Sequence, residues 1–198
     1  MKRRAVLLGL AVSGCGLSER PYEERRSWPI RVPRPASLPA RAGGKVLELR
    51  TLRAGPGLEA RGLQVLRADG SVHVDYYEEW AVPPAQGVED ALRSWLGESG
   101  LFAAVVAPGS RASADFVLEG ELSALWCEPA AGVAHAAMTI VVLTQSALSP
   151  LVLLQRRLTA TAELSSEDAA AQVQAQLAAL TIVLAGAEAA LRPLALRR

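Results

Sequence analysis

The chain has 198 residues, 51% of them hydrophobic, and its formal net charge is only +1. Residues 46–198 hold 11 basic and 17 acidic residues, so this part has no excess of positive charge. That balance argues against a nucleic-acid partner, because a protein that binds nucleic acid needs a basic face.

The first residues have the layout of a bacterial export signal, which we assign to residues 1–14. Lys2–Arg4 are positively charged, and Ala5–Val12 form an apolar stretch too short to span a bilayer. The next segment, Val12–Cys15 (VSGC), resembles the lipobox of bacterial lipoproteins. The resemblance implies acyl chains on Cys15, and several such chains make a stable anchor. Gly16, in place of aspartate, favours the outer membrane in Gram-negative lipoproteins. The alternative is an ordinary signal peptide with a chance cysteine.

Residues 15–45 are expected to form an unstructured tether between this lipid and a folded domain. They contain five prolines and a pair of glycines but almost no periodic apolar pattern, which is typical of an extended linker. From residue 16 to residue 45, seven residues are basic and three are acidic. This balance could hold the tether against anionic headgroups. Alternatively, the segment is a solvated linker whose arginines have no specific role.

Alternating apolar and polar residues, bounded by glycine and proline, predict seven strands in a domain that we place at residues 46–198. The predicted strands are residues 45–53, 63–67, 71–77, 101–106, 115–126, 133–144 and 151–163. Asp69 and Gly70 lie between two of these runs, and Asp-Gly in that position is typical of a β-hairpin.

A helix is predicted from Val88, after a corner at Pro83-Pro84 that prevents further strand pairing. Its apolar residues have the spacing of a helix packed on one side; they are Val88, Ala91, Leu92, Trp95 and Leu96. Glu89 and Asp90 fall in the predicted first turn, where the helix dipole favours negative charge. Gly100 is expected to follow the helix in a left-handed conformation.

A second helix is predicted near the end of the chain, opening at Ser165 with Asp168 at the capping-box distance. Its apolar seam could pair with a helix of a second subunit, or it could simply cover a sheet. The most apolar stretch, Leu177–Leu196, is interrupted by charged residues and a proline, and we assign it to a folded core rather than to a membrane. The order of elements predicts an α/β (α+β) fold, a two-layer sandwich in which two helices cover one face of a largely antiparallel sheet.

Few residues are suited to catalysis or metal binding. Cys127 and His135 could face each other across a hairpin as a thiol–imidazole pair; alternatively, Cys127 is an ordinary buried cysteine. With His73 as the other histidine, the spacings do not make a zinc site. We therefore predict no catalytic residue, no metal and no cofactor, and we do not expect an enzyme.

Several motifs resemble one known family. They are Tyr76-Tyr77 followed by Trp80 and Pro83-Pro84, the segment Ser99–Phe102 after the helix, the Leu-Glu-Gly-Glu-Leu run at residues 118–122, and an alanine-rich last helix. Together with the lipobox, they resemble the ABC-type transport auxiliary lipoprotein family, which includes the paraquat-inducible outer-membrane lipoproteins. The resemblance covers most of residues 46–192.

The resemblance implies a non-catalytic lipoprotein on the periplasmic face of the outer membrane. It would serve an MCE-type system that moves phospholipids or other hydrophobic molecules between the two membranes. The implied partners are an MCE-domain protein with the ABC permease and ATPase of the same system, and further copies of this chain in a homo-oligomer. Tyr77, Trp80, Pro83 and Pro84 are the candidate docking residues, together with the last helix. Trp80 could instead seal the core behind the two prolines.

Two other functions remain open on the sequence. The protein could be a structural lipoprotein of a different outer-membrane complex, for secretion or lipopolysaccharide export. It could also carry lipid by itself, which would require an apolar cavity of several hundred Å³ between sheet and helices.

Overall fold

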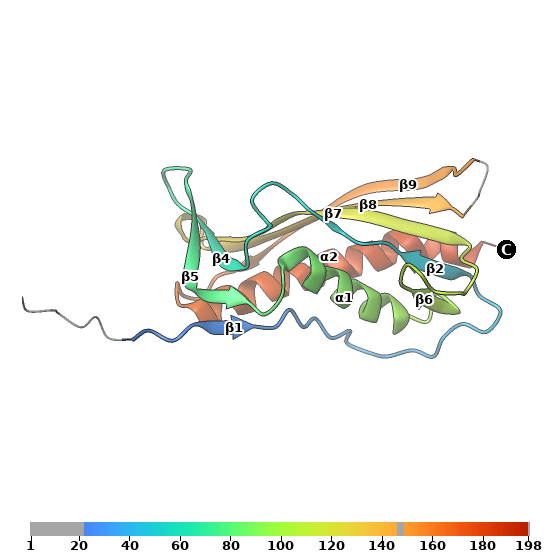
Figure 1. The fold of residues 1–198 in the computed structure, drawn as a ribbon, viewed down its shortest axis with the longest axis horizontal. Coiled ribbons are helices and arrows are strands. Elements are labelled where there is room, and N and C mark those ends of the chain that lie inside the picture. The colour runs from blue at the N-terminus through green and yellow to red at the C-terminus, as the bar shows by residue number, and fades with distance from the viewer. Residues whose placement is uncertain (1–21, 146–148, 198) are drawn as a thin grey trace, which may run out of the picture.

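The structure, a computed structural model, describes residues 22–145 and 149–197 and shows one sheet with two helices on one of its faces (Figure 1). In these residues the strands are β1 (Arg26–Trp28), β2 (Val46–Leu49), β3 (Arg53–Ala54), β4 (Gly62–Leu66), β5 (Val72–Trp80), β6 (Ala104–Val106), β7 (Phe116–Glu128), β8 (Val133–Thr144) and β9 (Val152–Glu163). The helices are α1 (Pro84–Gly97) and α2 (Ala169–Leu196), with a short 3-10 helix at Pro129–Ala131. The predicted signal sequence and Cys15 lie outside the described residues.

β7 is the central strand, because both of its edges are paired. One edge pairs antiparallel with β8 along its whole length, and β8 in turn pairs antiparallel with β9. Three short strands, β2, β3 and β4, share the other edge and pair with it in parallel. β4 also forms the predicted antiparallel hairpin with β5, while β6 and β1 extend the sheet in parallel beside β2 and β5. The long pairings are therefore antiparallel, and the predicted two-layer fold is confirmed.

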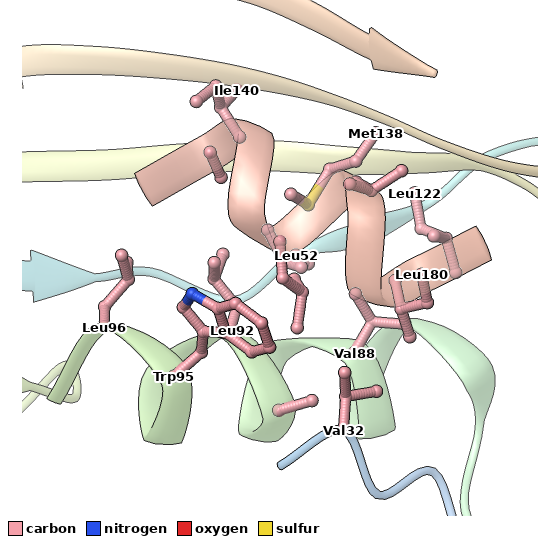
Figure 2. Packing of buried hydrophobic residues seen from close by; sticks show 14 of the residues in the cluster. Val32, Leu52, Val88, Leu92, Trp95, Leu96, Leu122, Met138, Ile140 and Leu180 are labelled. Carbon is pink, nitrogen blue, oxygen red and sulfur yellow. The ribbon is translucent and has the colours of Figure 1, made fainter. Parts of the chain in front are cut away.

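The core lies between the sheet and the helices. Figure 2 shows Val88, Leu92 and Trp95 of α1 pointing toward the sheet, close to Leu52 and Met138. The sheet residues of this core that are at most 1% exposed are Leu47, Leu49, Leu63, Trp80, Leu118, Leu122, Leu125, Ala136, Met138, Ile140 and Val142. Each large apolar side chain buried in this way stabilises the fold by about 1.5–3 kcal/mol.

The first helix begins four residues earlier than predicted. Pro83 is its N-cap residue and Pro84 its first residue, a position that tolerates proline because the first amides of a helix have no intrahelical acceptor. Glu89 therefore lies in the second turn, where it is buried and accepts a hydrogen bond of 3.0 Å from the Leu52 N–H. The predicted role of Glu89 at the helix dipole is wrong. Gly100 has the predicted left-handed conformation, with φ of 68°, although α1 already ends at Gly97.

The second helix begins at Ala169, and Asp168 is its N-cap. The Asp168 carboxylate accepts a hydrogen bond of 3.0 Å from the Ala171 N–H, so Asp168 caps the helix itself and the predicted start at Ser165 is wrong. By length and composition α2 could cross a membrane. Here its buried residues, such as Leu180 and Leu184, pack against the sheet, so it serves as a core helix.

Residues 26–41, which the sequence assigned to an unstructured tether, run along α1 instead (Figure 1). We call this segment the strap. β1, at its start, pairs with β5. Val32 is buried against α1, and Ile30 lies over Gly87, where an added Cβ would come within 2.8 Å of the Ile30 Cδ1 atom. The absence of a side chain at Gly87 therefore allows the strap to approach the helix, and the tether prediction is wrong for this segment.

The strap keeps its contact with α1 to the far end of the helix. The Leu38 N–H donates a hydrogen bond of 2.8 Å to the Glu98 carbonyl, and the Arg41 N–H donates one of 3.0 Å to the Phe102 carbonyl. The folded part of the chain thus begins near Arg26, about 20 residues before the boundary that the sequence suggested.

Candidate interaction surfaces

The four predicted docking residues divide into two exposed and two buried residues. Tyr77 and Pro83 are exposed, whereas Pro84 is buried and Trp80 is only 1% exposed. Trp80 ends β5, and its backbone N–H donates a hydrogen bond of 2.7 Å to the Arg61 carbonyl. This position agrees with the alternative in which Trp80 seals the core. Of these four residues, a partner can therefore reach only Tyr77 and Pro83.

The outer part of β5 is more exposed than the proline corner. Val72 and Val74 lie on one face of the strand, Tyr76 follows at a shift in register, and all three are exposed. The Tyr76 ring lies edge-on to the Tyr77 ring, at 5.1 Å between centroids. The Arg25 guanidinium lies 3.8 Å from the centroid of the Tyr76 ring, a cation–π contact that links β5 to the residues before the strap.

The face of the sheet opposite the helices carries ion pairs. Glu119 of β7 is bound to Arg50 at 2.5 Å, and Glu121 pairs with Arg53 at 3.4 Å. Alternate residues of a strand point to opposite faces, so these carboxylates lie opposite the buried Leu118 and Leu122. We call this surface the open sheet face. Because its charges are largely paired and exposed, they contribute little to stability but give the surface a polar pattern that a protein partner could match.

Shallow hollows lie on the open sheet face, two of them in addition to a third near Val117 and Leu143. One, of about 450 Å³, is lined by the Arg50–Glu119 and Arg53–Glu121 pairs. The other, of about 430 Å³, is lined by Trp126, His135 and neighbouring threonines and alanines. Both are on the opposite side of the sheet from the helices. They therefore differ from the apolar cavity between sheet and helices that carriage of lipid by this domain alone would require.

Cys127 and His135 do not form the thiol–imidazole pair considered from the sequence. His135 lies opposite Trp126 in the β7–β8 register, one residue away from Cys127, so the two side chains point to opposite faces. The Cys127 thiol is buried under α2, where burial raises its pKa to about 11. His135 instead contacts Glu128 on the open sheet face, at 2.8 Å. Within residues 22–145 and 149–197, no cluster of three or more histidine, cysteine, aspartate or glutamate side chains could hold a metal.

A buried carboxylate, which the sequence analysis did not single out, joins the strap to both helices. Glu188 of α2 accepts a hydrogen bond of 2.8 Å from the Trp95 indole of α1 and one of 3.0 Å from Arg34 of the strap. Arg192 lies one turn further along α2 and donates another, at 2.9 Å. Burial alone raises the pKa of Glu188, but these hydrogen bonds and the two positive charges outweigh it and hold the pKa below its usual value. The signal in the sequence was a single glutamate in an otherwise apolar helix stripe.

Comparison with known protein families assigns the chain to one of them. Residues 30–185 match the family model described as ABC-type transport auxiliary lipoprotein component. The chain belongs to this family. The match begins within the strap and ends inside α2, so the family's common part contains the sheet from β2 to β9 and the whole of α1. The protein is therefore an auxiliary lipoprotein component of ABC-type transport, as the motifs at residues 76–85 and 118–122 suggested.

Solved structures share the fold of this family member. A Xanthomonas campestris protein of the family DUF330 is 22% identical, with a TM-score of 0.67 over 87% of this chain and 94% of that chain. An uncharacterized protein is 13% identical, with a TM-score of 0.62 over 77% of this chain and 94% of that one. PelC from Paraburkholderia phytofirmans, solved as a dodecamer, is 16% identical, with a TM-score of 0.50 over 82% and 96% of the two chains. At these identities the likeness concerns the fold alone. No curated protein sequence is significantly similar to the chain.

Proposed function

We propose that this lipoprotein is anchored through Cys15 to the periplasmic face of the outer membrane and serves an MCE-type transport system. The system would move lipids or other hydrophobic molecules between the inner and outer membranes. The match of residues 30–185 to the transport auxiliary family carries the proposal. The VSGC segment that ends at Cys15 supports the anchor.

The role we propose is binding rather than catalysis. The thiol of Cys127 is buried, and His135 points to the other face of the sheet. The domain exposes three surfaces to which a partner could bind. They are the exposed Tyr77 and Pro83, the open sheet face, and the outer side of α2, where Ile182 is exposed. We infer that the MCE-domain protein docks on one of these surfaces and that the permease and ATPase are reached through it.

A homo-oligomer is the second part of the proposal. PelC, which has a similar fold, was solved as a dodecamer. The open sheet face of this chain carries the Arg50–Glu119 and Arg53–Glu121 pairs, with Arg157 beside a hollow, and a second copy could match such a polar surface.

The test is photo-crosslinking of the acylated full-length protein in its own membranes. A photoreactive amino acid would replace Tyr77, Gln155 of the open sheet face or Ile182 of α2, one position in each variant, and captured proteins would be identified by mass. Capture of an MCE-domain protein, together with its permease, would support the proposal and show which surface binds it. Capture of this chain alone would support only the oligomer.

Two results would count against the proposal. Capture of a barrel, a secretin or a secretion component would replace it with the structural role in another outer-membrane complex. The Cys15→Ser variant supplies the control for the anchor: if it stays in the outer-membrane fraction like the wild type, Cys15 does not hold the protein there.

A further inference from the structure

Exposed apolar side chains gather at one end of the molecule. Among the described residues, ten large hydrophobic side chains are exposed, and half of them lie on β5 or on the chain just before the strap. These are Tyr22, Val72, Val74, Tyr76 and Tyr77. The β4–β5 hairpin projects from the end of the long axis at which the chain enters the fold, and the end of β8 and the start of β9 lie at the opposite end (Figure 1). An apolar group of this kind usually marks a site of contact with a protein or a membrane.

The hairpin exposes these side chains before and at an irregularity in β5. Val72, Val74 and Tyr76 are 55%, 42% and 66% exposed. Val72 and Val74 lie in regular register with Leu66 and Gln64, at the period of two that places them on one face. Tyr76 follows where the register shifts, and its ring packs against that of Tyr77. Tyrosine and valine on a surface of this kind suit the boundary between headgroups and acyl chains, because the tyrosine ring is apolar while its hydroxyl remains hydrated.

The length of chain before Tyr22 decides which surface this face can meet. Six residues lie between Cys15 and Tyr22, and the fully extended chain from one to the other reaches about 24 Å. A tether that remained free up to residue 46 would reach about 100 Å by the same measure. Because the strap is bound along α1, the lipid anchor must lie near the end of the molecule that carries the hairpin. The contact between Arg25 and the Tyr76 ring, at 3.8 Å, directs the entering chain across the hairpin's apolar face.

We propose that the exposed β5 side chains of Val72, Val74 and Tyr76 rest in the interfacial layer of the bilayer that holds the Cys15 anchor. The inference depends on the proposed acylation of Cys15. Contact with the bilayer fixes the orientation of the domain, with the β4–β5 hairpin on the membrane and the start of β9 directed away from it. The acyl chains on Cys15 then provide the affinity for the membrane, and the hairpin contact sets the orientation of the domain.

The surrounding charges indicate a shallow and mainly apolar contact. Arg26 pairs with Glu78, and Arg61 pairs with Glu79, so neither arginine is a free cation for an anionic headgroup. The Asp69-Gly70 turn at the tip of the hairpin is polar and exposed, so it belongs in the hydrated headgroup region. We therefore expect these two arginines to add little salt dependence to the contact, unlike the free cations of a basic patch.

The experiment measures the polarity around one label on acylated full-length protein in vesicles of phosphatidylethanolamine and phosphatidylglycerol. Val72→Cys places an environment-sensitive fluorophore on the hairpin face. Val152→Cys is the matched control, because Val152 is also an exposed valine, at 61%, and lies in the strand at the opposite end. Cys127 is buried with a pKa raised to about 11, so the native thiol does not compete for the label.

We expect the emission at position 72 to shift to the blue when vesicles are added, and lipids with a quencher near the headgroup to quench it. Neither change should occur at position 152. Flotation of the protein with the vesicles reports the anchor separately. If the protein floats but position 72 remains in water, the inference is wrong while the anchored transport role stands. If it does not float, both the anchor and the membrane contact are wrong. A blue shift that appears without vesicles and grows with protein concentration would assign this face to a second copy and overturn the inference.

Discussion

Replacing Glu188 by glutamine tests how the strap is held, because this substitution removes one charge from a buried ion pair and changes little in shape. The side chains of Glu188 and Arg34 are only 8% and 13% exposed. Glutamine can still accept the hydrogen bond from the Trp95 indole, but the Arg34 guanidinium loses its buried counter-charge. Breaking a buried pair from one side costs about 3–5 kcal/mol. We expect the lower end, about 3 kcal/mol, because the strap lies at the surface and Arg34 can turn toward water.

Urea unfolding at neutral pH, followed by tryptophan fluorescence, measures this loss, and thermal unfolding should show a midpoint lower by about 6–12 °C for a chain of this size. Glu121→Gln is the matched control, since its partner Arg53 is 81% exposed and an exposed pair contributes at most about 1 kcal/mol. The double variant Arg34→Met/Glu188→Gln should lose less stability than the sum of the losses of the two single variants. Each single change already breaks the same ion pair, so the second change has no pair left to break.

The same carboxylate predicts a pH dependence. The pKa of Glu188 in the folded protein lies below its ordinary value of 4.5, so its stabilising effect is complete above that value and disappears as the pH falls through the lower folded pKa. Between about pH 5 and pH 3, the wild type should lose more stability than the Glu188→Gln variant. If the variant unfolds at the same urea concentration as the wild type at neutral pH, or if both lose stability equally on acidification, Glu188 does not hold the strap.

Other predictions concern the hairpin and the core. Trp80→Ala should destabilise the domain by about 3–5 kcal/mol, whereas Tyr77→Ala should cost only about 1 kcal/mol; equal urea midpoints for the two variants would contradict the burial of Trp80. Gly62→Ala should loosen the hairpin, because a Cβ at Gly62 collides with the Asp75 carbonyl, and faster hydrogen exchange in β4 and β5 would reveal it. Cys127 should react with iodoacetamide only after unfolding, since burial raises the pKa of its thiol to about 11; rapid alkylation of the native protein would show that the thiol is accessible.

The strap shows why local pattern was an incomplete guide. Trp28, Ile30, Val32 and Arg34 point inward in alternation, a period of two that predicts an extended segment lying on a surface. The prolines between them concealed this signal, because proline in a composition count favours a linker. The composition of the strap is that of a linker. An extended segment with few apolar residues can nevertheless bind along a helix where the helix has no side chain in the way, as α1 has none at Gly87.

The sequence also did not determine the register of the β7–β8 pair. The strands at 115–126 and 133–144 were predicted as an antiparallel pair, and β7 and β8 confirm it. Whether Cys127 meets His135 depends on a shift of one residue, and such a shift moves a side chain to the other face of the sheet. A connection of several residues, here a 3-10 helix at Pro129–Ala131, does not determine that shift from its composition.

The first residues of the two helices were predicted wrongly for a related reason. Apolar spacing located both helices, but their first residues depended on the cap. Pro84 begins α1 before any apolar stripe is visible, and Asp168 caps α2 with its own carboxylate. The buried Glu188 was visible in the sequence only as an interruption of the stripe, because its partners Arg34 and Trp95 come from distant parts of the chain.

The parallel pairing of β1 with β5 has a mechanical consequence for a protein held at its amino-terminal end. Arg26, Ser27 and Trp28 lie in register with Glu78, Glu79 and Trp80. Tension that enters at Tyr22 and acts along the strand loads these backbone hydrogen bonds in shear, all at the same time, instead of opening them one after another. The buried Arg34 lies behind them and bears load only after β1 has slipped. The attachment is therefore strongest against a pull along the length of the molecule and weakest against one that peels β1 sideways from the sheet.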